Sequence, residues 1–157
     1  MDAQTLHRAL DESNKLRARL YLEIFRAAER RVGRMAAIEI LREAIRKWGG
    51  DQGEGLKCHA PAHFDGLVTD FATIPDGGIM FDPECTKEGE GLRMHMRRCP
   101  LKLAWQDAGL SDDELALMCS IAAEADYGTI ERAGFAVEIE TWKPGHAGCC
   151  VLHVRRA

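Results

Sequence analysis

A long stretch without proline, from Thr5 to Trp48, constrains the fold of this chain more than any other feature of its sequence. Leucine, alanine, arginine and glutamate, which all favour helices, dominate it. Apolar residues recur there at helical spacing: Leu6, Leu10, Leu16, Leu20, Ile24, Ala27 and Ala28. Gly33 interrupts this pattern, and Gly49-Gly50 is expected to end it. The stretch predicts two long helices or one kinked helix.

Three segments in the C-terminal part alternate between apolar and polar residues, as strands do. The first begins at Leu92 and ends at Cys99-Pro100. The other two are 135–142 and 149–156, joined by a turn around Pro144. Because short connections join neighbouring antiparallel strands, an antiparallel sheet is expected.

Two shorter helices are expected between these strands. One follows Pro100, and the other begins at a capping box formed by Ser111 and the acidic residues after it. The second helix is expected to continue as far as Asp126. The fold class is therefore α+β, with long N-terminal helices packed on an antiparallel sheet and two further helices.

Glycine and proline are frequent between residues 49 and 90, so this part is expected to be rich in loops. Short strands are expected there at 67–72 and 78–81. From the length of 157 residues we expect one domain, 1–157. Its three parts are a helical one at 5–48, a loop-rich one at 49–90 and an α+β one at 91–157.

The composition is that of a globular protein, with 46% hydrophobic and 29% charged residues. No apolar run approaches the roughly 20 residues of a membrane span, and the polar start has no apolar signal core, so a cytoplasmic protein is expected. The net charge is −4, and the arginines of the first helices alternate with glutamate. We therefore expect no nucleic-acid or membrane partner, whereas a small anionic substrate is compatible. Apolar residues on the long helices exceed what one small sheet covers, which favours a homo-oligomer.

Cys99 stands where a strand is expected to become a helix, with Pro100 in the first helical position. Backbone N–H groups at a helix start stabilise a thiolate, so Cys99 is a candidate nucleophile. The alternative is a small buried residue at a strand end. No C-x-x-C pair is present among the six cysteines, so spacing excludes a zinc ribbon and a thioredoxin-type motif.

The other candidate groups are weaker on sequence alone. Cys119 and Asp126 lie on roughly one helix face, too far apart to touch but able to line one pocket, although core packing explains a lone helical cysteine as well. Cys149 and Cys150 are expected on opposite faces of the last strand. The run from Cys58 to His63 offers His59 and His63 as metal ligands at a plausible spacing. Cys85 is expected in a polar loop without a role.

The C-terminal half, MRRCPLKLAWQDAGLSDDELALMCSIAAEADYGTIERAGFAVEIETWKPGHAGCCVLHV, resembles the L-2-amino-thiazoline-4-carboxylic acid hydrolase family over roughly 20–155. The markers are Cys99-Pro100, the Cys119 and Asp126 pair, and Gly145-x-x-x-Cys149. The resemblance implies hydrolysis at the carbon between sulfur and nitrogen of a small five-membered ring, of the thiazoline- or thiohydantoin-carboxylate type. It implies Cys99, Asp126 and Cys119 as catalytic residues, with a cysteine thiolate or a metal-bound hydroxide as nucleophile.

A more distant similarity concerns zinc. The pattern Glu138-x-x-Thr141-x-x-x-Gly145-x-x-x-Cys149 is similar to the zinc-holding pattern of vinyl-reductase-type ligand-sensing domains, in which a cysteine typically stands at the Thr141 position. The similarity implies Cys119, Glu138 and Cys149 as three zinc ligands with one position open for water, or no metal at all. It also implies the alternative function, a non-catalytic ligand-sensing or scaffold domain.

Overall fold

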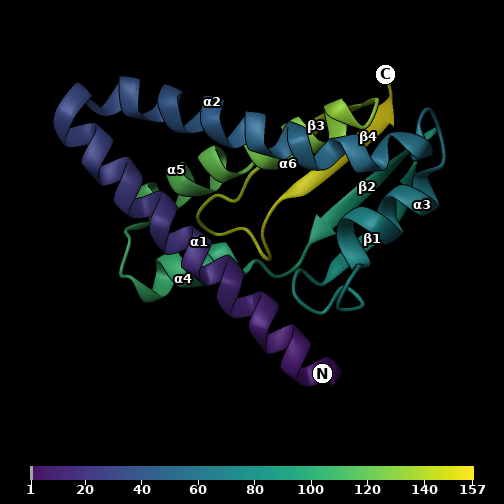
Figure 1. The fold of residues 1–157 in the computed structure, drawn as a ribbon, viewed down its shortest axis with the longest axis horizontal. Coiled ribbons are helices and arrows are strands. Elements are labelled where there is room, and N and C mark those ends of the chain that lie inside the picture. The colour runs from purple at the N-terminus through teal and green to yellow at the C-terminus, as the bar shows by residue number, and fades with distance from the viewer. Residues whose placement is uncertain (1) are drawn as a thin grey trace.

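Two long helices form a V in the computed structural model, which describes residues 2–157 (Figure 1). Helix α1 (Ala3–Val32) ends at Gly33, and helix α2 (Arg34–Gly53) begins directly after it. Gly33 has a φ of 85°, a backbone conformation that residues other than glycine rarely adopt, and the chain changes direction at this residue. Of the two forms predicted from the sequence, the two separate helices are therefore correct.

A four-stranded antiparallel sheet contains β1 (Pro83–Glu88), β2 (Gly91–Met96), β3 (Phe135–Glu140) and β4 (Val151–Arg156). The strand order is β1-β2-β4-β3. The α+β class and the three predicted strands are confirmed, with the last two strands shorter than predicted. The edge strand β1 was not predicted, and it places Cys85 in the sheet rather than in a loop.

The predicted strands at 67–72 and 78–81 are wrong. The first lies in α3 (Phe64–Val68) and a π-helical turn, η2 (Thr69–Thr73), and the second lies in turns. The hydroxyl of Thr69 donates to the Asp65 carbonyl, and the hydroxyl of Thr73 donates to the Thr69 carbonyl. Because their hydroxyls bond to carbonyls four residues back, these β-branched threonines are accommodated in a helical conformation. A 3-10 helix, η1 (Glu54–His59), occupies another part of the expected loop region.

Three helices follow β2: α4 (Pro100–Asp107), α5 (Asp112–Ala122) and α6 (Glu124–Arg132). The capping box predicted at Ser111 is present, because the Ser111 hydroxyl accepts from the Glu114 N–H and the Glu114 carboxylate accepts from the Ser111 N–H. The helix after this capping box ends earlier than predicted, so Asp126 belongs to α6 instead.

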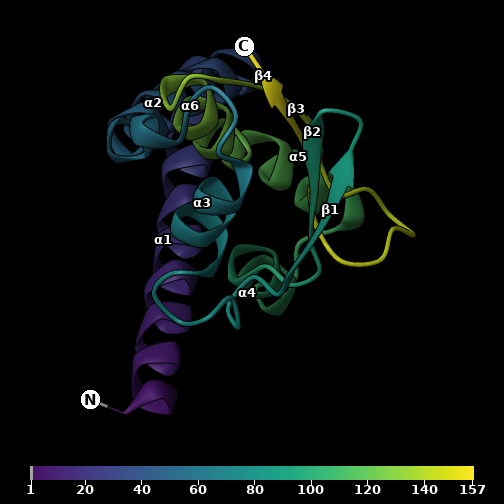
Figure 2. The ribbon, with the colours of Figure 1, turned by 90° about the vertical axis from the view of Figure 1, so that its right-hand side faces the viewer.

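The helices α1, α2, α3 and α6 lie on one side of the sheet, which Figure 2 shows nearly edge-on. Trp105 of α4 is buried and donates its indole N–H to the Ala18 carbonyl at 2.8 Å, which ties α4 to α1. The predicted excess of apolar surface is present on α1, where Leu16, Leu20 and Ile24 are 45–61% exposed. The homo-oligomer inferred from it stays a prediction. No helix within residues 2–157 combines the length and apolarity needed to cross a membrane.

Helix α2 continues through Gly49-Gly50 to Gly53, contrary to the predicted end, because α6 packs against its glycines. A Cβ at Gly49 would overlap the Ala125 carbonyl, and a Cβ at Gly128 would overlap the Arg46 carbonyl. The Thr129 hydroxyl donates to the Gly49 carbonyl at 2.9 Å across the same contact. The glycines therefore allow a close helix crossing rather than ending the helix.

Two neighbouring glycines of α2 allow a matched test of this contact. Gly49→Ala is expected to lower the free energy of unfolding by about 2 kcal/mol or more, because the new methyl overlaps backbone of α6. Gly50→Ala is the control, since its Cβ would lie 3.9 Å from the Gly128 carbonyl oxygen and alanine favours helix by about 0.5–1 kcal/mol. Urea denaturation measures both. Equal effects of the two substitutions would contradict the close packing.

Candidate active site

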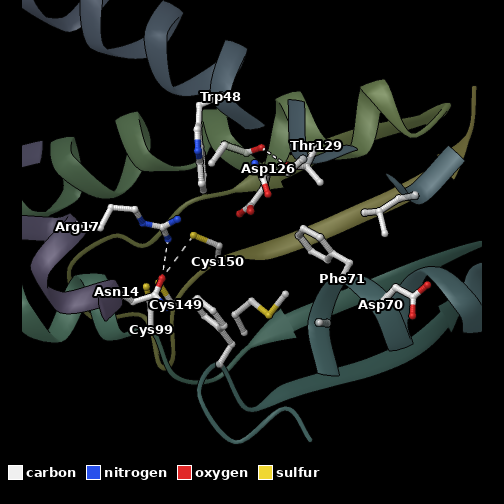
Figure 3. A pocket seen from close by; sticks show the side chains of 16 residues that line it. Asn14, Arg17, Trp48, Asp70, Phe71, Cys99, Asp126, Thr129, Cys149 and Cys150 are labelled. Carbon is white, nitrogen blue, oxygen red and sulfur yellow. Dashed lines mark hydrogen bonds between the residues drawn. The ribbon is translucent and has the colours of Figure 1, made fainter. Parts of the chain in front are cut away.

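A cavity of about 350 Å³ opens between α1, α2, α6 and the residues that precede β4 (Figure 3). Its walls include Arg17, Trp48, Cys99, Asp126, Thr129, Cys149 and Cys150. A smaller cavity of about 80 Å³ shares several of these residues and adds Cys119. The fold thus brings four of the six cysteines together with Asp126, although they come from four separate parts of the sequence.

Cys99 is the N-cap residue of α4, and Pro100 is the first residue of this helix, as predicted. The Cys149 thiol donates to the Cys99 sulfur and lowers the pKa of Cys99 below its usual range. Burial opposes this shift, and the backbone N–H groups of Lys102 and Leu101 add to it. The net lowering of the pKa favours a thiolate at the start of α4.

Cys149 and Cys150 precede β4 and do not lie on opposite faces of a strand, so that prediction is wrong. The Cys149 N–H donates to the Met96 carbonyl at 2.8 Å, and the Met96 N–H donates to the Cys150 carbonyl at 2.9 Å. These two bonds fix both cysteines at the end of β2, close to Cys99. Their sulfur atoms are 3.8 Å apart, and both residues line the cavity.

Cys119 is buried in α5 behind Cys149. Its thiol donates to Cys149, and this hydrogen bond together with burial raises the pKa of Cys119. At Cys149 the bond from Cys119 favours the thiolate, but the hydrogen bonds that Cys149 shares with Cys150 and Cys99, together with burial, raise its pKa as well. The raised pKa values favour the protonated form of Cys119 and Cys149, whereas the lowered pKa of Cys99 favours its thiolate.

Asp126 lies on α6 and points into the cavity (Figure 3). Burial raises the pKa of its carboxyl group to about 6, and the positive charge of Arg17 partly opposes this shift. Within residues 2–157 the carboxylate makes neither a hydrogen bond nor an ion pair. A carboxyl group that titrates near neutral pH and has unused hydrogen-bonding capacity is suited to give and take a proton.

The proposed zinc ligands do not form a site. Cys119 and Cys149 are close together, but Glu138 is exposed on β3 and lines neither cavity that holds them. In the other candidate pair, His59 Nε2 lies 2.7 Å from Asp70 Oδ2, and His59 Nδ1 lies 3.4 Å from His63 Nδ1. Over the described part of the chain no group of three or more His, Cys, Asp or Glu residues is arranged to hold a metal ion. The three residues that the zinc pattern combines are therefore not gathered at one point, and zinc binding stays a prediction.

The sequence analysis missed the residues that α1 and α2 contribute to the cavity. The Arg17 guanidinium carbon lies 5.0 Å from the centre of the Trp48 ring, and Arg17 Nη2 donates to Asn14 Oδ1 at 2.8 Å. No sequence signal distinguishes Arg17 from the other arginines of this helix, because only the angle between α1 and α2 directs it toward Trp48. Cys58 and Cys85 lie outside the cavity.

Comparison with known proteins identifies one family. The family model described as L-2-amino-thiazoline-4-carboxylic acid hydrolase matches residues 13–153. No curated protein and no solved structure matches the chain. Because the match covers most of the chain, the protein belongs to the L-2-amino-thiazoline-4-carboxylic acid hydrolase family, as the sequence motifs predicted, and the family's name indicates a hydrolase.

The hydrogen bond from Cys149 to Cys99 predicts how the reactivity of the Cys99 thiol depends on pH. Cys99 is expected to be alkylated by iodoacetamide with a midpoint below that of an ordinary thiol. Cys149→Ala removes the donor and is expected to raise this midpoint, whereas Cys85→Ala, on β1, is the control and leaves it unchanged. Mass spectrometry of the Cys99 peptide against pH measures the rates. A midpoint that is the same in all three proteins would contradict the assignment.

The raised pKa of Asp126 predicts a dependence of stability on pH. The ionised carboxylate is disfavoured in the folded protein, so wild-type stability falls, relative to Asp126→Asn, as pH rises from about 4 through about 6. The variant is therefore expected to be the more stable protein at pH 7.5, and the difference is expected to disappear below pH about 4. Urea denaturation at both pH values measures it. A difference independent of pH would show that Asp126 has an ordinary pKa.

Proposed function

We propose that the protein opens a small five-membered ring, of the thiazoline- or thiohydantoin-carboxylate type, by adding water at C2. Cys99 is the nucleophile, and Asp126 is the proton donor and acceptor. One observation carries the proposal: in one cavity, a thiol has its pKa lowered and a carboxyl group has its pKa raised to about 6. Perturbed pKa values cluster at catalytic sites, where burial and hydrogen bonds prepare groups for proton transfer and nucleophilic attack.

The first half of the reaction breaks the ring, taking 2-amino-thiazoline-4-carboxylate as the example. The Cys99 thiolate attacks C2, and the electrons of the C=N bond move to the ring nitrogen, which takes the proton of Asp126. The C2–S bond of the ring then breaks as a nitrogen lone pair restores a C=N bond. The departing sulfur takes a proton from this nitrogen and becomes a thiol, so a carbon joined to Cys99 remains.

The second half releases the product and restores the enzyme. Water attacks the same carbon, and the electrons of its C=N bond move to the nitrogen. Asp126, now a carboxylate, takes one proton of the water, and the other proton passes to this nitrogen as the C=O bond forms. The bond to the Cys99 sulfur breaks, and Cys99 leaves as a thiolate. One water is consumed, no electron is transferred to a cofactor, and the product is an N-carbamoyl cysteine. The low pKa of Cys99 serves both halves, because it favours the attacking thiolate and makes the sulfur a good leaving group.

The walls of the cavity suit a small ring. Phe71, Phe81 and Trp48 supply apolar and aromatic surface to the cavity. Its polar groups include Arg17 and Asn14 near Cys99, and Asp70 on the side of Phe71 (Figure 3). A cavity of about 350 Å³ is at the small end of the range for ligand pockets in proteins. The protonated thiols of Cys149 and Cys119 keep Cys99 oriented and supply no second nucleophile.

Substitution of the cysteines tests this proposal. Cys99→Ser is expected to lower kcat for ring opening at least about a thousandfold, because a serine hydroxyl is hardly ionised at neutral pH. Cys149→Ser is expected to lower kcat less, since it keeps a donor, and Cys85→Ser is expected to keep wild-type activity. Release of thiol from a panel of thiazoline and thiohydantoin carboxylates measures the rates, with and without added zinc.

Two results of that experiment would overturn the proposal. The first is wild-type activity in Cys99→Ser, which would show that Cys99 is not the nucleophile. The second is the absence of turnover on the whole panel by the wild-type protein. If one of the ring compounds then raises the thermal stability of the protein, and mass spectrometry finds that compound unchanged after incubation, the protein is a ligand-binding domain rather than an enzyme.

A further inference from the structure

Arg17 is a partly buried cation with unused hydrogen-bonding capacity beside the proposed nucleophile. Its Nε is buried and has no hydrogen-bond partner, and Nη1 makes no hydrogen bond. Within residues 2–157 the guanidinium forms no ion pair. Arg17 lines the cavity, so a ligand there can accept hydrogen bonds from the part of the guanidinium that faces the cavity.

The surroundings hold the guanidinium in one orientation. Asn14 accepts from Arg17 Nη2, and Asn14 Nδ2 itself donates to the Leu10 carbonyl at 3.0 Å. The Trp48 ring packs on the guanidinium from α2. Figure 3 shows the guanidinium between Trp48 and Asn14, pointing toward Cys150. A cation held in this way loses little side-chain entropy when it binds an anion.

The other two cations near Cys99 are already engaged. Arg98 pairs with Asp11 at 2.7 Å and donates to the Met80 carbonyl at 2.7 Å. The Lys102 ammonium group donates to the Gly148 carbonyl and lies 5.4 Å from the centre of the Trp142 ring. Neither residue lines the larger cavity. Arg17 is therefore the cation that a ligand in this cavity meets.

We propose that Arg17 binds the carboxylate of the substrate and thereby selects ring carboxylates over uncharged rings. The identity of the ring rests on the proposed function, whereas the anion site rests on Arg17 and its surroundings. A carboxylate on a guanidinium forms charge-assisted hydrogen bonds, which are about twice as strong as neutral ones. The ring would then extend from Arg17 toward Cys99 and Asp126.

Binding at Arg17 would also affect the proton of Asp126. The positive charge of Arg17 lowers the pKa of Asp126 in the unliganded protein, opposing the effect of burial. A bound carboxylate neutralises this charge, so the Asp126 proton is held more firmly in the complex than in the unliganded protein. The substrate anion would thus help to keep Asp126 in the protonated form that the first half of the reaction uses.

A binding experiment that needs no turnover tests the inference. The probes are thiazolidine-4-carboxylate, a saturated ring without the electrophilic C=N carbon, and its 4-carboxamide. Isothermal titration is expected to show the carboxylate binding the wild-type protein at least about tenfold more tightly than the carboxamide. Arg17→Gln is expected to bring this ratio close to one, and Arg17→Lys to keep part of it. In turnover, Arg17→Gln is expected to raise KM more than it lowers kcat.

Arg42→Gln is the matched control. Arg42 is also a partly buried helical arginine with an unpaired Nε, but it bonds Ser120 and does not line the cavity, so its loss should leave the preference unchanged. A preference that persists in Arg17→Gln, or that is absent from the wild-type protein, would overturn the inference. Absence of turnover with an intact, Arg17-dependent preference would instead overturn the proposed reaction and leave the anion site in place.

Discussion

The close contact between α2 and α6 fixes the two walls of the cavity relative to each other. Gly49 and Gly53 on one helix and Gly128 on the other bring backbone against backbone, and Thr129 bonds the Gly49 carbonyl across the contact. Trp48 and Asp126 adjoin these contacts on α2 and α6. Arg46 also bonds Glu124 and Glu131 across the interface. A shift of one helix would therefore separate the aromatic wall from the carboxyl group.

The parts of the fold that local sequence determines were predictable. The helices before Trp48, the capping box at Ser111 and Cys99 as the N-cap of α4 each depend on residues adjacent in sequence. The end of α2 was not predictable, because Gly49-Gly50 is a helix-ending signal that the distant α6 overrides. The helical state of 69–73 likewise depends on threonine hydroxyl bonds, which compete with the strand preference of the same residues.

The candidate site was predictable only as a set of residue types. The sequence offered Cys99, Cys119, Cys149 and Asp126 as candidates. It did not indicate that Cys119, Cys149 and Cys150 would all gather beside Cys99. That arrangement depends on two backbone bonds between Met96 and the residues before β4, which fix Cys149 and Cys150 against the end of β2. The position of Arg17 beside Trp48 depends on the angle between α1 and α2, which no local sequence pattern encodes.

Because α1 and α2 meet directly at Gly33, we expect the number of residues between Arg17 and Trp48 to be more constrained than their identities. The two residues lie about equally far from Gly33 along opposite arms of the V, and no loop separates the arms. Inserting one residue in either arm would rotate everything beyond it by about 100° and carry one partner out of the cavity. Exposed positions on both arms are open to substitution. Insertions and deletions between Arg17 and Trp48 are not expected to be tolerated, because the length of this segment fixes the positions of the two residues relative to each other.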